Sequence, residues 1–184
     1  MRRTLLSSAV ALVGVVALVV IGAAGGAQAK KPALSATPVF KLHLKPSQEV
    51  VEPRIKGLKA DAVGSVTFDV TRNAAGAITS GEVVFYFNYS FPGAVQVSGL
   101  HIHKGNKGAN GGVEIGATLS AADSALDPDG HGNVMSVVSV VAGDLAKLQA
   151  ILDNPRGYYV NLHTTTPLHP DGALRDQMHN PKKR

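Results

Sequence analysis

The sequence predicts an all-β fold, an antiparallel Greek-key β-sandwich or barrel of about eight strands with one short crossover helix. Apolar and polar residues alternate over several stretches, which is the period of half-buried strands. Clusters of glycine, proline, asparagine and aspartate separate these stretches and predict turns. Only one segment has the spacing of a helix, so an all-β architecture follows.

The first 29 residues have the order of a secretory signal peptide. Arg2 and Arg3 precede an apolar run at residues 9–21, and the segment ends in Ala27-Gln28-Ala29. We therefore expect cleavage after Ala29 and a secreted or extracytoplasmic protein. An uncleaved membrane anchor is the alternative, although the apolar run is shorter than the ~20 residues of a spanning helix. Both Sec and twin-arginine export remain open.

The rest of the chain is expected to form one domain. Residues 30–37 have the composition of a linker, residues 38–179 carry the strand pattern, and residues 180–184 form a basic tail. The absence of cysteine excludes disulfides, iron–sulfur clusters and thiol catalysis. The basic residues are dispersed and are not interleaved with aromatic residues, so we expect no nucleic-acid binding.

The strands are expected in regular succession along this domain. The alternation begins at residues 40–44, where Phe40, Leu42 and Leu44 would face the core. Further strands are expected at residues 62–71, 77–89, 97–103, 113–119, 134–141, 158–163 and 173–178. The strand at 77–89 has apolar residues on both rows, which predicts a central strand covered on both faces. The helical pattern spans residues 143–152, with Asp144 as its N-cap.

The stretch from residue 97 to residue 112 holds the pattern with the clearest chemistry. It is a predicted strand ending in His101-Ile102-His103, followed by a loop rich in glycine. Residues two apart in a strand point to the same face, so both imidazoles would share a row with Val97 and Gly99. Neutral imidazole is a common ligand of copper and zinc, so this pair is a candidate for holding a mononuclear copper or zinc ion, although a His-x-His pair alone is a weak signal.

A metal site needs ligands from elsewhere in the chain. His163, in a predicted late strand, is expected to be the third ligand, and His131, in a predicted Asp-Gly hairpin turn at 127–133, a possible fourth. The alternative is that these histidines are hydrogen-bonded parts of the fold. The metal hypothesis requires the three rings to point to one place. Rings spread over different surfaces, or each tied to a backbone carbonyl, would exclude it.

Three motifs together resemble the CHRD domain, the module repeated in the secreted growth-factor antagonist chordin and also found alone in exported microbial proteins. The motifs are His101-Ile102-His103-Lys104-Gly105, Tyr159-Val160-Asn161-Leu162-His163-Thr164 and Gly172-Ala173-Leu174-Arg175-Asp176-Gln177, and Ser47-Gln48-Glu49-Val50 fits the start of the family. The resemblance covers roughly residues 40–178. It implies an extracellular module and marks Asn161, Thr164 and Arg175 as motif residues. The family usually has glutamate at position 173 and glycine at position 176, so any role of that glutamate is absent here.

The chain is also similar, more weakly, to copper/zinc superoxide dismutase, another Greek-key sandwich. His101, His103 and His163 would take the places of metal ligands, and Arg175 that of an arginine that steers an anion to the metal. The zinc ligands of that enzyme cannot be assembled from the loop after His103, which contains no histidine. A dinuclear centre is therefore not expected.

Two functions are compatible with these patterns. The first is a non-catalytic binding or adhesion module outside the cytoplasm, with an extracellular protein or a cell-envelope component as its partner and no membrane contact after signal cleavage. This function predicts an exposed apolar patch. The second is the mononuclear metal site, either structural or redox-active. No nucleophile elbow and no clear pair of catalytic carboxylates accompany either, so enzyme activity is not predicted.

Overall fold

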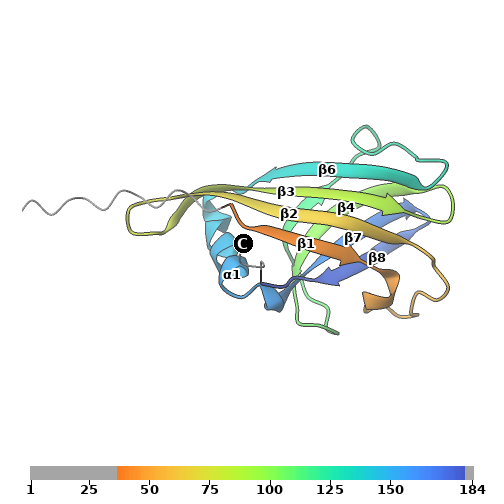
Figure 1. Cartoon of the computed structure of the whole chain (residues 1–184), viewed down its shortest axis with the longest axis horizontal. Helices are drawn as coiled ribbons and strands as arrows, with labels where there is room; N and C mark the ends of the chain where they lie inside the picture. The colour runs from red at the N-terminus through yellow and green to blue at the C-terminus, as the bar shows by residue number, and fades with distance from the viewer. Residues whose placement is uncertain (1–36, 181–184) are drawn as a thin grey trace, which may run out of the picture. The chain divides into compact units, whose positions relative to one another are not determined.

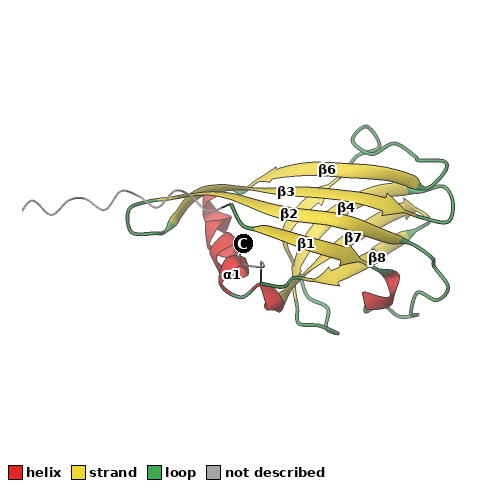
Figure 2. Ribbon diagram, viewed as in Figure 1, coloured by secondary structure: helices red, strands yellow, loops and turns green. Residues whose placement is uncertain are grey.

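The computed structural model describes residues 37–180, which form two β-sheets with one α-helix (Figures 1 and 2). The strands are β1 (Val39–Leu44), β2 (Asp61–Arg72), β3 (Ile78–Ser90), β4 (Gln96–Lys104), β5 (Val113–Thr118), β6 (His131–Ser139), β7 (Tyr158–Thr166) and β8 (His169–Gln177), and the helix is α1 (Leu145–Asp153). The expected signal peptide lies outside the described residues. None of the helices within residues 37–180 is long and apolar enough to cross a membrane.

Each sheet has four antiparallel strands, and the connections have Greek-key character. The first sheet has the order β1-β2-β3-β6 and the second sheet the order β5-β4-β7-β8. The chain leaves the first sheet after β3, forms the β4–β5 pair in the second, and returns to place β6 beside β3. The helix α1 then connects β6 to β7 in the other sheet. The predicted all-β sandwich with one crossover helix is confirmed.

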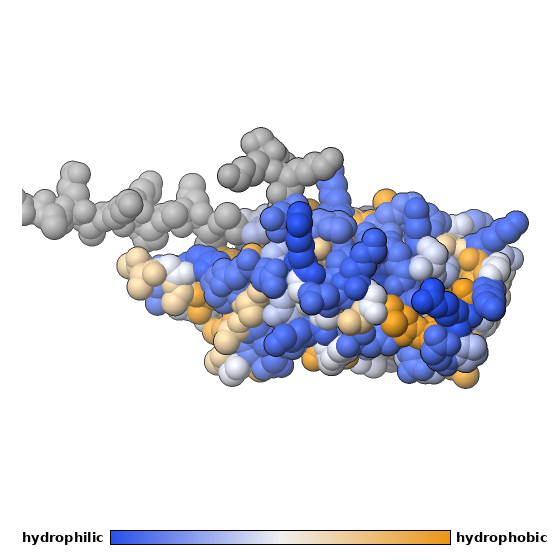
Figure 3. Space-filling view, turned by 90° about the horizontal axis from the view of Figure 1, so that it is seen from below, coloured by the Kyte–Doolittle hydropathy of each residue, from blue (hydrophilic) through white to orange (hydrophobic). Residues whose placement is uncertain are grey.

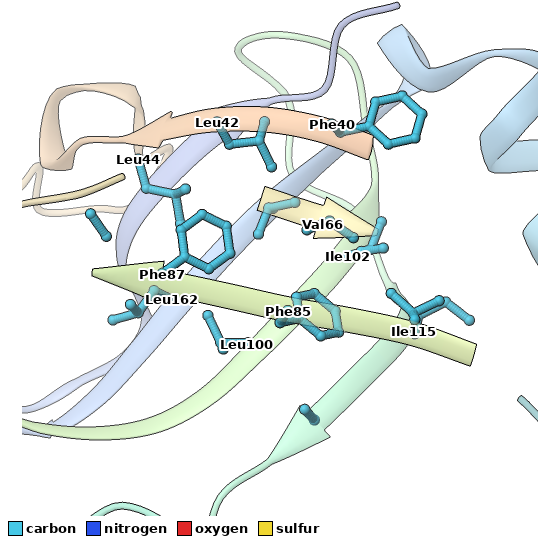
Figure 4. Close-up of a cluster of buried hydrophobic side chains, with 14 of the residues drawn as sticks. Phe40, Leu42, Leu44, Val66, Phe85, Phe87, Leu100, Ile102, Ile115 and Leu162 are labelled. Atoms are coloured by element: carbon cyan, nitrogen blue, oxygen red, sulfur yellow. The ribbon is translucent and has the colours of Figure 1, made fainter. Parts of the chain in front are cut away.

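The core lies between the inner faces of the two sheets (Figure 4). Phe85 and Phe87 of β3 face Leu100 and Ile102 of β4, and all four are completely buried. The row expected from the first alternation, with Phe40 at its start, is buried in this core as predicted. Burial of side chains of this size stabilises the fold by about 1.5–3 kcal/mol each.

The helix α1 packs as its periodicity predicts but is capped differently. Leu148 and Ile151 are fully buried and extend the core at one end of the sandwich. Asp144 makes no side-chain capping hydrogen bond; its carboxylate instead pairs with Lys147 at 2.9 Å, one turn further along. Asp144 therefore occupies the predicted N-cap position, but its side chain does not cap the helix.

Three local expectations differ from the structure. Val97 faces the core because the pairing of β4 with β7 shifts register between Val97 and Gly99, and such an irregularity reverses the faces on either side of it. The outer face of β3 is not covered, since Tyr86 is 41% exposed. The segment expected as a hairpin turn before His131 instead joins β5 to β6, which belong to different sheets.

The surface seen in Figure 3 is mainly hydrophilic, with hydrophobic residues in small groups between the polar ones. Its composition is that of an ordinary solvent-facing surface. The polar cluster that concerns function lies on the outer face of the second sheet, opposite the core.

Candidate metal centre

The outer face of the second sheet brings the three predicted histidines together. His101 and His103 project from β4, and His163 projects from the neighbouring strand β7. In the register of these strands His101 pairs with Asn161, and Gly99 pairs with His163. The two-residue period of a strand places His101 and His103 on one face, and antiparallel pairing places His163 diagonally opposite His101.

The three imidazoles converge on one point. Each offers a ring nitrogen, and these nitrogens lie within 4.8 Å of one another. The ring centroids are 4.5 Å apart for His101 and His163, 5.6 Å for His101 and His103, and 6.0 Å for His103 and His163. Zn–N bonds of about 2.0–2.1 Å in a tetrahedron require nitrogens about 3.3 Å apart, so modest ring rotations would close the cluster around one ion.

Hydrogen bonds to backbone carbonyls orient two of the rings. Nδ1 of His103 lies 3.0 Å from the Gly111 oxygen, and Nδ1 of His163 lies 2.8 Å from the Pro170 oxygen. Because a carbonyl oxygen only accepts, each Nδ1 carries the proton and each Nε2 keeps its lone pair. Both Nε2 atoms are buried and have no hydrogen-bond partner among the described residues.

A hydrogen bond from one ring nitrogen to a backbone carbonyl therefore does not exclude that histidine as a metal ligand. The expectation that rings tied to backbone carbonyls would exclude a metal site was too strict. Metal-ligating histidines regularly donate their second nitrogen to a carbonyl or carboxylate, which fixes the tautomer and the ring orientation. His103 and His163, with exposed fractions of 9% and 8%, are held in that way. The Nε2 atom of each ring remains available.

His101 is positioned by two glycines rather than by a hydrogen bond. A Cβ atom added at Gly99 would lie 3.1 Å from Nε2 of His101, and one added at Gly116 would lie 3.0 Å from its Cδ2. The ring therefore lies flat over two residues that have no side chain. Its Nδ1 is buried without a partner among the described residues. Each ring of the cluster thus has one buried nitrogen without a partner among the described residues: Nδ1 of His101 and Nε2 of His103 and of His163.

The cluster is electrically neutral at neutral pH. Burial, and then the neighbouring imidazoles of His163 and His103, together lower the pKa of His101 to about 4, because adjacent rings resist carrying charge together. Burial also lowers the pKa of His103 and of His163, against the opposing effect of their backbone hydrogen bonds. Neutral rings are the form that binds a cation.

Two further side chains, those of Tyr159 and Arg175, stack in succession next to His103. The ring of Tyr159 lies parallel to that of His103, with an interplanar angle of 8° and centroids 4.9 Å apart. The guanidinium carbon of Arg175 lies 3.4 Å from the centroid of the same tyrosine ring. Because β7 lies between β4 and β8, Tyr159 lies between the histidine and the arginine.

Arg175 is a loop-holding residue and not an anion-steering one. Its side chain is 1% exposed and donates to Oδ1 of Asn110 at 3.0 Å and to the backbone oxygens of Asn106 and Ala109 at 3.2 and 2.9 Å. These acceptors belong to the glycine-rich loop that folds back over the sheet. The role suggested by the similarity to superoxide dismutase is therefore wrong for this arginine, because the guanidinium is buried under the loop.

The other motif residues support the same region. The Asn161 side chain is buried beside Glu49, with its Nδ2 3.4 Å from Oε2 of Glu49. Thr164 is buried and donates its hydroxyl to the Pro167 oxygen in the β7–β8 turn. Burial raises the pKa of Glu49 to about 7, although the charge of Arg175 and the Asn161 hydrogen bond oppose this rise.

His131 is not part of the cluster. It is exposed, it begins β6 at the edge of the first sheet, and it is absent from the group of converging ligand atoms. The suggestion that it supplies a fourth ligand is wrong because its strand returns to the other sheet. The sequence patterns did not identify Gly111, Pro170 and Glu49 as residues that support the cluster. Of the three, only Gly111 had a signal in the sequence, which is the high number of glycines in its loop.

The cluster opens into a pocket of about 630 Å³. Its floor is the histidine face with Tyr159, and its walls come from the glycine-rich loop, from residues 50–52 and from residues 170–171. The wall at 50–52 is tied to the loop by a hydrogen bond from the Asn110 side chain to the Val50 oxygen. The three histidines therefore line a pocket of a size that admits ions and small molecules.

The fold and this site define a class of protein: a cysteine-free Greek-key β-sandwich with a three-histidine cluster on the outer face of one sheet. The model of the CHRD domain family matches residues 40–178. The chain belongs to the CHRD domain family, as its motifs indicated. No curated protein and no solved structure matches the chain.

Proposed function

We propose that this CHRD-domain protein binds one copper or zinc ion outside the cytoplasm, through Nδ1 of His101 and Nε2 of His103 and of His163. Two observations carry the proposal: each of the three imidazoles brings a ring nitrogen within 4.8 Å of the others, and each ring has a buried nitrogen without a hydrogen-bond partner among the described residues. A buried polar atom left without a partner costs about 1–3 kcal/mol. A shared cation would satisfy all three nitrogens at once.

The donor set suits these two metals. Imidazole nitrogen binds both copper and zinc, and affinity for such sites is highest for copper among the first-row divalent ions. The rings are held by carbonyls and glycines and stay neutral, so little reorganisation or proton release would accompany binding. The ion would supply Lewis acidity, or electron transfer if it is copper, at the base of an open pocket.

The extracytoplasmic location rests on the order of the first 29 residues, which is that of a signal peptide. A histidine-only site fits such a location, because imidazole ligands do not oxidise to disulfides as cysteine ligands would. The absence of cysteine from the whole chain agrees with this.

Elemental analysis of the purified mature protein tests the proposal. We expect near-stoichiometric copper or zinc after incubation with each metal and removal of the excess. His103→Ala and His163→Ala should each lose the ion, whereas His131→Ala, which removes an exposed histidine from the other sheet, should keep it. A protein that stays metal-free after incubation, or an equal loss in the His131→Ala variant, would refute the site.

A second function, binding or adhesion, has its own supporting observation on the opposite side of the sandwich. Tyr86 and Met135 pair directly across β3 and β6 and are 41% and 64% exposed, and Val63 and Val137 are exposed on the same outer face of the first sheet. An apolar group of this kind is typical of an interaction surface. We propose an extracellular protein or a cell-envelope component as its partner.

Retention on isolated cell envelopes of the native host tests the binding function. The double variant Tyr86→Ser with Met135→Ser should lower retention, while His103→Ala should not. Equal retention of all three proteins would show that this face is not the binding surface.

A further inference from the structure

In a four-coordinate site the proposed ion would have one position that none of the described residues fills. Within residues 37–180, the group of converging ligand atoms contains only the three histidines. Zinc sites with four protein ligands are structural, whereas sites with three protein ligands leave a position for water or another external ligand. All three histidines project from the sheet below, so the free position faces the pocket above it.

The space above the cluster is large enough for an organic molecule. The pocket at the histidines, about 630 Å³, adjoins a second pocket of about 570 Å³. The two share Val51, Glu52, Pro170 and Asp171 as a common wall. The second pocket is lined by further prolines, which offer apolar surface. Volumes of this size are typical of pockets that bind small organic molecules.

The charges around the free position favour one class of ligand. Among residues 37–180, Glu52 and Asp171 are the only carboxylates that line the histidine pocket, and no lysine or arginine lines it. Arg175 is buried under Tyr159 and is bonded to the loop. Arg54 and Lys56 line only the adjoining pocket, beyond the two carboxylates. An anion that approaches the histidines through this pocket therefore passes two negative charges, whereas the positive charge of Arg175 lies behind the Tyr159 ring that stacks on His103.

We propose that the open position accepts a small organic molecule with an uncharged nitrogen donor, an imidazole or an amine that releases its proton to solvent before it binds, in preference to an anion. The inference rests on the proposed metal function, because without the ion there is no open position. The nitrogen lone pair would bind the metal, and the two carboxylates would lie beside the organic body of the ligand. The same carboxylates would repel an anionic donor.

Copper(II)-loaded protein titrated separately with imidazole and with azide tests the proposal, with visible absorption and electron paramagnetic resonance as readouts. A carboxylate about 8 Å from a bound anion weakens the binding of that anion by roughly two- to sixfold. The effects of two such carboxylates multiply, so the removal of both should strengthen anion binding by roughly the product. The double variant Glu52→Gln with Asp171→Asn should therefore bind azide about fivefold more tightly or better, with little change for imidazole. Asp69→Asn, which removes an exposed carboxylate from the first sheet, should change neither.

The outcomes separate this inference from the metal function. A protein that binds no copper before the titration refutes the metal function itself. A copper-loaded protein whose spectra respond to neither probe has no open position, and the inference fails while the metal function stands. An azide-to-imidazole affinity ratio that is the same in the native protein and in the double variant also overturns the inference, because the carboxylates then do not select the ligand.

Discussion

The Gly111 carbonyl accepts a hydrogen bond from Nδ1 of His103 at 3.0 Å. The N–H of the same glycine faces the Tyr159 hydroxyl at 3.4 Å, so one loop residue is tied to a proposed ligand and to the ring stacked on it. The glycine-rich loop thus orients the His103 ring. A Cβ atom at Gly111 would lie 1.6 Å from the Lys104 oxygen, which makes glycine the only residue that fits there.

The first prediction concerns this loop. Gly111→Ala should displace the loop, weaken metal binding at least tenfold and lower the free energy of unfolding by about 2 kcal/mol, a magnitude typical of overpacking. Gly112→Ala is the matched control, because a Cβ atom there meets nothing within 4 Å. Calorimetric titration with copper or zinc and urea unfolding would measure the two effects. Equal behaviour of the two variants would contradict the role of Gly111.

The second prediction concerns the glycines beneath His101. In Gly116→Ala the new methyl group would lie 3.0 Å from Cδ2 of His101 and 3.1 Å from Cγ1 of Val113, so the ring must move. We expect metal affinity to fall about tenfold while far-ultraviolet circular dichroism stays unchanged. Gly143→Ala, at an open position far along the chain, should leave the affinity as it is. A normal affinity in Gly116→Ala would show that His101 is not a ligand.

The third prediction concerns Arg175. Its guanidinium donates to three acceptors of the loop and packs on Tyr159, and lysine cannot reproduce this planar set of donors. Arg175→Lys should therefore cost about 2–4 kcal/mol of unfolding free energy, since buried acceptors lose their partners. It should also accelerate hydrogen exchange of the loop amides at residues 105–111. Lys104→Arg, at an exposed position next to the loop, serves as the control and should leave both measurements unchanged.

The fourth prediction concerns the pH dependence set by Glu49. Because burial raises its pKa from 4.5 to about 7, the folded state holds the proton more tightly than the unfolded state does. The resulting stability is fully present below pH 4.5 and is lost as the pH rises through 7. Glutamine imitates the protonated form at every pH. Glu49→Gln should therefore gain stability relative to the native protein between pH 4.5 and pH 8, by up to about 3 kcal/mol.

Urea unfolding of the metal-free protein at pH 4.5 and pH 8 measures that difference. Glu52→Gln, which changes an exposed carboxylate only three residues away, should show no such pH-dependent gain. If the stability difference between Glu49→Gln and the native protein were the same at both pH values, the carboxyl group of Glu49 would titrate as an ordinary exposed glutamate does.

Local periodicity was sufficient for much of the fold. The alternation of apolar residues in β1 and β3 identified the strands and their buried rows, because the two faces of a strand meet different surroundings. The same period placed His101 and His103 on one face. Where the backbone departs from the period, prediction failed: the register shift after Val97 moved that residue into the core, and nothing in the local sequence marks it.

The sequence by itself determined the strands, the shared face of His101 and His103, and the family, since each depends on residues close together in the chain or on motif identity. Only the tertiary structure decided the composition of the site. It brought His163 beside His101, placed His131 in the other sheet, and buried Arg175 under the loop. The pairing of β4 with β7 and the contact of Arg175 with the glycine-rich loop join residues more than fifty positions apart. Local sequence patterns do not indicate which distant partner a side chain contacts.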